Sequence, residues 1–284
     1  MIVRWKASFP VGYLCAQLGV SVSGFYEHLA AVPGPRKIRR DDLIVRVITA
    51  FSESNSAAGY RKITHVLRRD GVHVNRKTVA VIMSELGLIS PAAVRQHKVA
   101  RDRKARGTDP EDLVLRDFAS VVIGRVLVGD ITYVRTWQGW LYVATVIDLA
   151  SRTVLGYATG SRQTAKLAIK ALKMAHATGL VPVGAIFHTD HGVQYTSKAF
   201  TRYCGTLGVR RSMGKTYTCW DNACAETFFS KLKSERLEWI KFKTRAEAAR
   251  ETVKYVAYYN EKRLHQNLGY ITPHEKLEQL QMAA

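Results

Sequence analysis

The sequence predicts an α/β fold in which a mixed sheet with helices follows an all-helical region. Before residue 95, apolar side chains recur at helical spacing, and from residue 119 short β-rich runs alternate with amphipathic helical runs. With 284 residues and 47% hydrophobic composition, the chain can bury a large core and form two domains.

The charge of the chain indicates the class of its partner. The 43 Lys and Arg against 23 Asp and Glu give a net charge of +20, which implies a polyanionic partner. An anionic membrane surface is the competing interpretation, but no apolar run approaches the roughly 18 residues of a membrane span. Arg4, Lys6 and Pro10 interrupt the first segment, which argues against a signal peptide. The four cysteines lack paired metal spacing and an evident disulfide framework, so we expect a cytoplasmic, nucleoid-associated protein.

Residues 11–30 predict two short helices joined near Gly19, with Ser21 capping the second. This is the spacing of a helix-turn-helix, although a plain helical hairpin has the same pattern. We expect a loop over residues 33–40, in which Arg36 and Lys37 suit phosphate contact. The same basic loop is equally typical of a solvated linker.

A second helical pair is predicted over residues 61–70 and 76–86, with Asn75 as the N-cap of the later helix. A groove-reading helix makes its base contacts near its start, so this pair is the stronger candidate for DNA binding. The candidate contacts are the basic residues that end the first helix and open the second: Arg68, Arg69, Arg76 and Lys77. From residue 96 to 112 the pattern gives way to basic residues with Gly and Pro, which predicts an interdomain linker.

The second half of the chain predicts a five-stranded mixed sheet. The strands are expected at 126–134, 141–148, 153–158, 184–189 and 209–212, and helices at 164–178, 197–207 and from 221. The first three strands follow one another closely, as in an antiparallel meander. Three strands, helix, strand, helix, strand, helix is the order of the ribonuclease H-like fold.

Three carboxylates hold unusual positions in this pattern. Asp130 interrupts the first strand, where an aspartate is disfavoured and costly to bury without a partner. Asp190 ends the fourth strand, and ligands collect at the carboxyl ends of strands. Glu226 lies in the first turn of the last helix, at the margin of its apolar stripe. Each has a structural alternative, such as helix capping or an ion pair, and only the set indicates a site.

Two other interpretations of nearby residues are weaker. His188, Asp190 and His191 suggest zinc, but strand-end histidines are more often structural. The segment 208–216 resembles a phosphate-binding loop but has five residues instead of four between its glycines, so we reject it.

Several long motifs together resemble the integrase-core (DDE) transposases of bacterial insertion sequences. The likeness is greatest to the downstream-frame product of elements whose transposase is encoded in two overlapping frames. The motifs that carry it are 61–63, 75–77, 130–134, 148–152, 188–197, 221–226, 259–270 and Pro273. Leu127 and Tyr217 depart from the family, which often has Trp and Gly there.

The resemblance implies that Asp130, Asp190 and Glu226 form the catalytic triad. It implies two Mg²⁺ ions, replaceable by Mn²⁺, with Asp130 bridging both, Asp190 on one and Glu226 on the other. The implied reaction is cleavage and strand transfer at insertion-sequence ends. Two alternatives are a ribonuclease H-like nuclease without strand transfer and a non-catalytic DNA-binding regulator.

The implied partners are double-stranded DNA, as element ends and as target, and further copies of the chain on that DNA. An upstream-frame protein or its frameshift fusion is a further implied partner. Additional DNA contacts are expected at Lys233, Lys262 and Arg263. The neighbouring Tyr255, Tyr258 and Tyr259 suit a DNA or subunit surface, or equally pack the last helix onto the sheet. The expected domains are a helical DNA-binding region at 1–95, a basic linker at 96–118, a ribonuclease H-like catalytic core at 119–242 and a C-terminal helical segment at 243–284.

Overall fold

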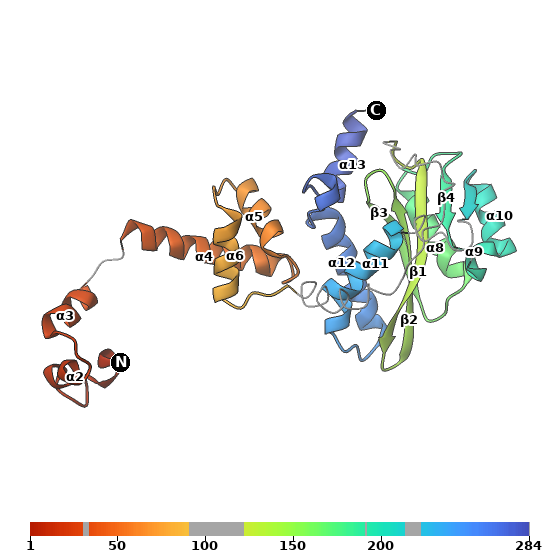
Figure 1. Ribbon diagram of the computed structural model, residues 1–284. Helices are drawn as coiled ribbons and strands as arrows, with labels where there is room; N and C mark the ends of the chain where they lie inside the picture. The colour runs from red at the N-terminus through yellow and green to blue at the C-terminus, as the bar shows by residue number, and fades with distance from the viewer. Residues whose placement is uncertain (31–33, 91–121, 191, 214–222, 284) are drawn as a thin grey trace, which may run out of the picture. The chain divides into compact units, whose positions relative to one another are not determined.

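The computed structural model describes residues 1–30, 34–90, 122–190, 192–213 and 223–283 (Figure 1). The chain forms two compact units, Met1–Ile48 and Thr49–Ala284. The predicted linker at 96–112, His191 and Tyr217 lie outside the described residues. Among the residues that are described, no helix is both long and apolar enough to cross a membrane.

The first unit contains short helices around a small core. Its elements are α1 (Ile2–Trp5), α2 (Val11–Gln17), α3 (Val22–Ala30) and the first part of α4 (Pro35–Glu53). Ile2, Cys15 and Phe25 form the core. The predicted loop at 33–40 is wrong over its described residues, because Arg36 and Lys37 lie in the first turn of α4. Proline is favoured at the first position of a helix, and Pro35 begins this one.

The second predicted helical pair consists of α5 (Tyr60–Arg69) and α6 (Arg76–Glu85). Ile63, Leu67 and Val79 are buried where the two helices pack together. The side chain of Asn75 accepts a hydrogen bond of 2.9 Å from the backbone N–H of Lys77, which confirms the predicted N-cap.

The sheet has five strands in the order β3-β2-β1-β4-β5. Its strands are β1 (Val126–Thr136), β2 (Gly139–Asp148), β3 (Val154–Gly160), β4 (Ile186–Thr189) and β5 (Arg210–Met213). The first three form an antiparallel meander, while β4 is parallel to β1 and β5 to β4. This topology is ribonuclease H-like, as predicted.

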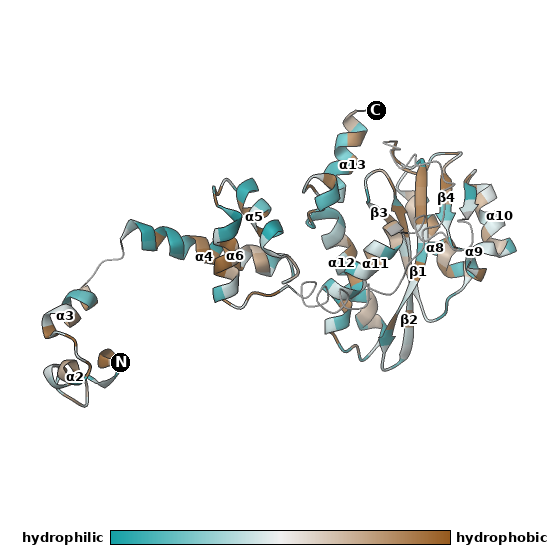
Figure 2. Cartoon of the chain, in the orientation of Figure 1, coloured by the Kyte–Doolittle hydropathy of each residue, from teal (hydrophilic) through white to brown (hydrophobic). Residues whose placement is uncertain are grey.

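Helices cover both faces of the sheet (Figure 1). They are α8 (Ala165–Ala177), α9 (Val193–Thr196), α10 (Lys198–Thr206), α11 (Ala223–Glu235) and α12 (Arg245–Glu261). The last helix, α13 (Pro273–Met282), packs on α12, and 3-10 turns lie at Leu237–Trp239 and Gln266–Leu268. One core lies between the sheet and α8 and α10, and the other between the sheet and α11 and α12. Figure 2 shows hydrophobic strands at the centre of this arrangement, as the β-rich runs of the sequence predict.

The tyrosines of α12 belong to the second core. Tyr255 and Tyr259 are almost fully buried, and the ring of Tyr259 meets Phe228 of α11 edge to face at 4.8 Å. They therefore pack the helix onto the sheet, and the surface-contact interpretation of Tyr255 and Tyr259 is wrong. Tyr258 is partly exposed.

Gly156 allows α8 to pack closely on β3. A Cβ there would clash with the backbone oxygen of Ala171 and would lie 2.6 Å from the backbone nitrogen of Ala175. We expect Gly156→Ala to lower the free energy of unfolding by about 1–3 kcal/mol, since overpacking forces the helix away. Gly160→Ala, on the same strand, is the control, because its Cβ would meet a flexible side-chain atom of Leu167 at 3.2 Å and the backbone oxygen of Arg162 only at an ordinary 3.8 Å. Urea unfolding of both variants measures the difference; equal stability would contradict the close packing.

Candidate active site

Asp130 lies in the middle of β1, just past the residues that pair with β4. The pairing with β4 covers Val126–Val128. On the other side of β1, Asp130 is opposite Thr145 of β2. Its carboxylate accepts a hydrogen bond of 2.7 Å from the backbone N–H of Ile131. The side chain is half-buried, in a strand whose neighbours are hydrophobic.

Asp190 and Glu226 approach the same region from two other elements. The parallel register pairs Val128 with His188, which places Asp190 level with Asp130 just past the end of β4. The backbone N–H of Gly192 donates to the Asp190 carboxylate at 3.1 Å. Glu226 is exposed in the first turn of α11, where the preceding Ala225 is buried in a cluster that includes Val128 of β1. Residues 221 and 222, where the sequence predicts that this helix starts, lie outside the described residues.

The charges of Asp190 and Glu226 both act on the carboxylate of Asp130. Burial, reinforced by the negative charges of Asp190 and Glu226, raises the pKa of Asp130 to about 7. The hydrogen bond from Ile131 and the charge of Lys233 only partly oppose this rise. Three acids from separate parts of the chain therefore share one electrostatic environment, which disfavours the ionised form of Asp130.

Two buried hydroxyl groups face this environment and were not predicted. Neither Thr145 Oγ1 nor the Tyr195 hydroxyl has a hydrogen-bond partner among the described residues. Burial raises the pKa of Tyr195, and the charges of Asp130 and Asp190 raise it further. The only sequence signal for Tyr195 is its place in the 188–197 motif, because its burial depends on packing against Phe187 and Phe200.

No set of three His, Cys, Asp or Glu side chains in the described part of the chain is close enough to hold a metal ion. His188, the basis of the zinc alternative, is buried, and its Nδ1 lies 3.1 Å from Ser212 Oγ. Another motif aspartate, Asp148, is fully buried and accepts hydrogen bonds from the N–H groups of Gly124 and Ser151, both at 2.9 Å. Asp148 therefore orders the turn between β2 and β3.

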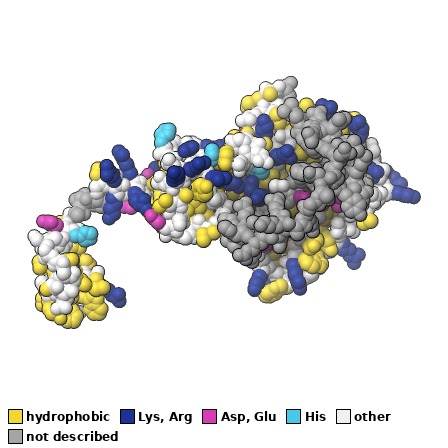
Figure 3. Space-filling model, in the orientation of Figure 1, with side chains coloured by type: hydrophobic (Ala, Val, Ile, Leu, Met, Phe, Trp, Pro, Cys, Tyr) yellow, Lys and Arg dark blue, Asp and Glu magenta, His cyan; other side chains and the backbone are white. Residues whose placement is uncertain are grey.

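The predicted DNA-contacting residues fall into different environments. Those exposed at the surface are Arg36, Lys37, Arg68, Arg69, Arg76, Lys77 and Lys262. Figure 3 shows Lys and Arg side chains along α4 and over α5 and α6. Arg68 donates to the backbone oxygen of Val74, and Arg69 forms an ion pair with Glu275. Lys233 is half-buried, with its Nζ 5.0 Å from the centre of the Tyr133 ring.

Arg263, which the sequence analysis placed among the DNA contacts, is buried. Its guanidinium forms two hydrogen bonds with Glu235, at 2.8 and 2.6 Å, and only 5% of the residue is exposed. A side chain held in this way cannot reach a phosphate. Arg263 therefore has a structural role, and the expectation that it contacts DNA is wrong.

Comparisons with known proteins identify the family of this chain. Residues 123–219 and 207–273 match models of the integrase core domain, and residues 39–97 match an HTH-like domain. The transposase InsF for insertion sequence IS3A of Escherichia coli (strain K12) is 36% identical over 280 residues, which are 96% of each chain. This chain belongs to the integrase-core transposases of bacterial insertion sequences.

Similar proteins also occur in other bacteria and among solved structures. The transposase for insertion sequence element IS904 of Lactococcus lactis is 34% identical over 85% of this chain and 95% of that protein. A solved structure, the simian T-cell lymphotropic virus intasome in complex with PP2A regulatory subunit B56 gamma, matches with a TM-score of 0.48 and 18% identity. That match covers 61% of this chain and 59% of the other. The transposase thus matches its curated relatives over both its helical region and its sheet.

Proposed function

We propose that this transposase cuts DNA at the ends of an insertion sequence and joins those ends to target DNA, with Asp130, Asp190 and Glu226 as its catalytic carboxylates. The observation that carries the proposal is the raised pKa of Asp130, which burial and the charges of Asp190 and Glu226 produce together. A carboxylate with a perturbed pKa that lies near two carboxylates from other elements is typical of a catalytic site.

The donor chemistry of the three carboxylates suits divalent ions of the magnesium type. All three candidate ligands offer carboxylate oxygens, which Mg²⁺ and Mn²⁺ prefer, and Mg²⁺ needs few protein ligands because it retains water and binds substrate phosphate. Burial is the main cause of the raised pKa of Asp130, and bound cations would offset the smaller contribution from the charges of Asp190 and Glu226. When bound, two such ions activate the attacking oxygen and stabilise the leaving oxygen in phosphodiester attack.

The chain's own residues supply position and charge. The backbone N–H groups of Ile131 and Gly192 orient the carboxylates of Asp130 and Asp190. The rigid strand β1 and helix α11 hold Asp130 and Glu226, which favours a fixed geometry for in-line attack by water and then by a DNA 3′-hydroxyl. No group of the protein needs to become covalently attached to the DNA.

The test uses purified full-length protein, DNA that carries an element end, and Mg²⁺. We expect nicked product and, with target DNA present, joined product. Nicking without joining would support a nuclease instead, and DNA binding without either product would support a regulator.

We assign the exposed residues at the start of α6 to DNA binding. Arg76 and Lys77 open a capped helix, where a groove-reading helix contacts DNA. Replacing both with Ala should weaken binding and lower the salt slope, log Kd against log salt, by up to about 1.8, since each lost phosphate contact contributes about 0.9. Lys170→Ala with Lys173→Ala, at two exposed lysines of α8, is the charge-matched control. An unchanged slope in the double variant would place the DNA site elsewhere.

We infer that the transposase acts as a multimer on DNA, because joining an element requires two DNA ends in one complex. The upstream-frame protein or its fusion remains a proposed partner. Mixing a Glu226→Gln subunit with a subunit that carries Arg76→Ala and Lys77→Ala tests whether one subunit's site serves DNA that another subunit binds. A mixture that joins DNA better than either variant alone is expected, and a mixture no better than the two variants separately would contradict the inference.

A further inference from the structure

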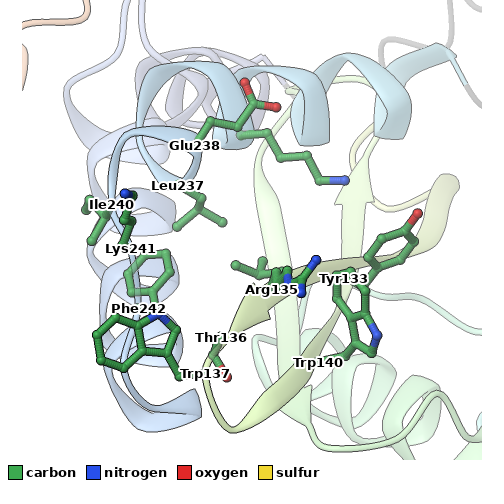
Figure 4. A pocket seen from close by; sticks show the side chains of 12 residues that line it. Tyr133, Arg135, Thr136, Trp137, Trp140, Leu237, Glu238, Ile240, Lys241 and Phe242 are labelled. Carbon is green, nitrogen blue, oxygen red and sulfur yellow. The ribbon is translucent and has the colours of Figure 1, made fainter.

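A cavity of about 400 Å³ lies between the β1–β2 hairpin and the segment that follows α11 (Figure 4). Aromatic side chains form one wall, where the rings of Tyr133 and Trp140 meet edge to face with centroids 5.0 Å apart. Trp137 also lines the cavity and is 74% exposed. The buried side chains of Leu237 and Phe242 complete its apolar part. We call this cavity the hairpin groove.

The hairpin groove carries more positive than negative charge. Arg135 lies over the Trp140 ring, with its guanidinium carbon 5.9 Å from the ring centre, and Lys241 is exposed. Lys233 lines the groove as well, and the acidic residue among the lining side chains is Glu238. Aromatic faces interleaved with cations suit an occupant that has both π-faces and negative charge.

Lys233 links the groove to the carboxylates electrostatically. Lys233 reaches the ring of Tyr133 and also acts on the charge of Asp130, so it connects the groove to the site. Tyr133 follows Asp130 by three residues on the same strand. Strand β4 pairs with β1 only over Val126–Val128, so in the described part of the chain it leaves the Tyr133 stretch open to an occupant.

We propose that the hairpin groove binds unpaired nucleotides of the DNA strand that is cut and joined at the carboxylates. A base stacks on the Tyr133 and Trp140 pair, and Arg135 and Lys241 hold the adjoining phosphates. Bases within a duplex are already stacked on one another, so only an unpaired base can use these rings. This inference rests on the proposed function, since it names where the strand of that reaction lies.

The test measures fluorescence anisotropy of a short labelled oligothymidylate and of a duplex of equal length, with full-length protein and no divalent ion. Salt of about 0.3 M weakens contacts made through phosphates alone. The variants are Tyr133→Ala and Trp140→Ala, both at exposed positions. Trp239→Ala is the matched control, because Trp239 is 57% exposed on the neighbouring segment but does not line the groove.

We expect each groove variant to bind the single strand about tenfold more weakly, while duplex affinity stays within twofold and the control behaves as wild type. Equal losses for both DNAs, or no loss for either, would overturn the proposal. A changed molecular mass in light scattering with unchanged DNA affinity would also overturn it, because the groove would then contact a second copy.

Failure of this inference is distinguishable from failure of the proposed function. The anisotropy measurement needs no catalysis, whereas the proposed function is decided by nicking and joining in Mg²⁺. A wild-type protein that cuts and joins, with groove variants that bind the oligothymidylate normally, would remove the groove inference alone.

Discussion

Asp130→Asn should reduce cleavage and joining by about a thousandfold or more while DNA affinity stays nearly intact. Removing one charged ligand forfeits several kcal/mol of transition-state stabilisation, and each 1.36 kcal/mol is a factor of ten in rate. The change leaves the basic surface of the protein untouched, so binding through phosphates persists. Asp190→Asn and Glu226→Gln should behave in the same way, because all three are proposed to act on one phosphodiester.

The stability of Asp130→Asn distinguishes lost chemistry from lost folding. Burial and two neighbouring negative charges disfavour the ionised Asp130, whereas a neutral amide can still accept the hydrogen bond from Ile131. We therefore expect a melting temperature equal to or above that of wild type, as is common for substitutions in active sites. Glu261→Gln neutralises an exposed acid of α12 and is the control, with normal activity expected. A fully active Asp130→Asn protein would refute the assignment of the triad.

Arg263→Met should lower the free energy of unfolding by about 3–5 kcal/mol, because it leaves the buried carboxylate of Glu235 without its charged partner. The exposed fractions of the two side chains are 6% for Arg263 and 2% for Glu235. The hydroxyl of Tyr255 also donates to Glu235, at 2.8 Å, but a neutral donor cannot replace the guanidinium. Burial and nearby cations lower the pKa of His265 to about 3, so it stays neutral beside Arg263.

Two comparisons test this explanation by urea unfolding. The double variant Glu235→Leu with Arg263→Met should recover most of the loss, because replacing both members of a buried pair leaves no unpaired charge. Lys254→Ala breaks an exposed pair with Glu251 on the same helix and should cost less than about 1 kcal/mol. A double variant as unstable as Arg263→Met would show that packing and not charge dominates.

The dependence on pH follows from the direction of the Glu235 pKa. Burial works to raise that pKa, but the hydrogen bonds and charge of Arg263 outweigh it and hold the pKa below its usual range. The pair therefore stabilises the protein at neutral pH, and this stability is lost as the pH falls through the lowered, folded-state pKa of Glu235. The difference between wild type and Arg263→Met should narrow over that acidic range.

Apart from the start of α4, the sequence by itself determined most of the secondary structure and the positions of the three acids along it. Asn75 caps α6 through a hydrogen bond two residues away, and the β-rich runs place Asp130 within a strand and Asp190 at the end of one. These features depend on contacts between near neighbours in the chain and on the period of apolar residues, which a sequence displays directly. The strand order followed because that succession of elements matches a known fold.

Only the tertiary structure decided which side chains of similar type are exposed and which are buried and paired. Lys262 and Arg263 are adjacent and both basic, yet Lys262 is exposed and Arg263 is buried against Glu235, which lies 28 residues earlier in the chain. Likewise, the raised pKa of Asp130 depends on Asp190 and Glu226 arriving from separate elements. Burial and charge pairing arise from contacts between distant parts of the chain, and local pattern does not specify them.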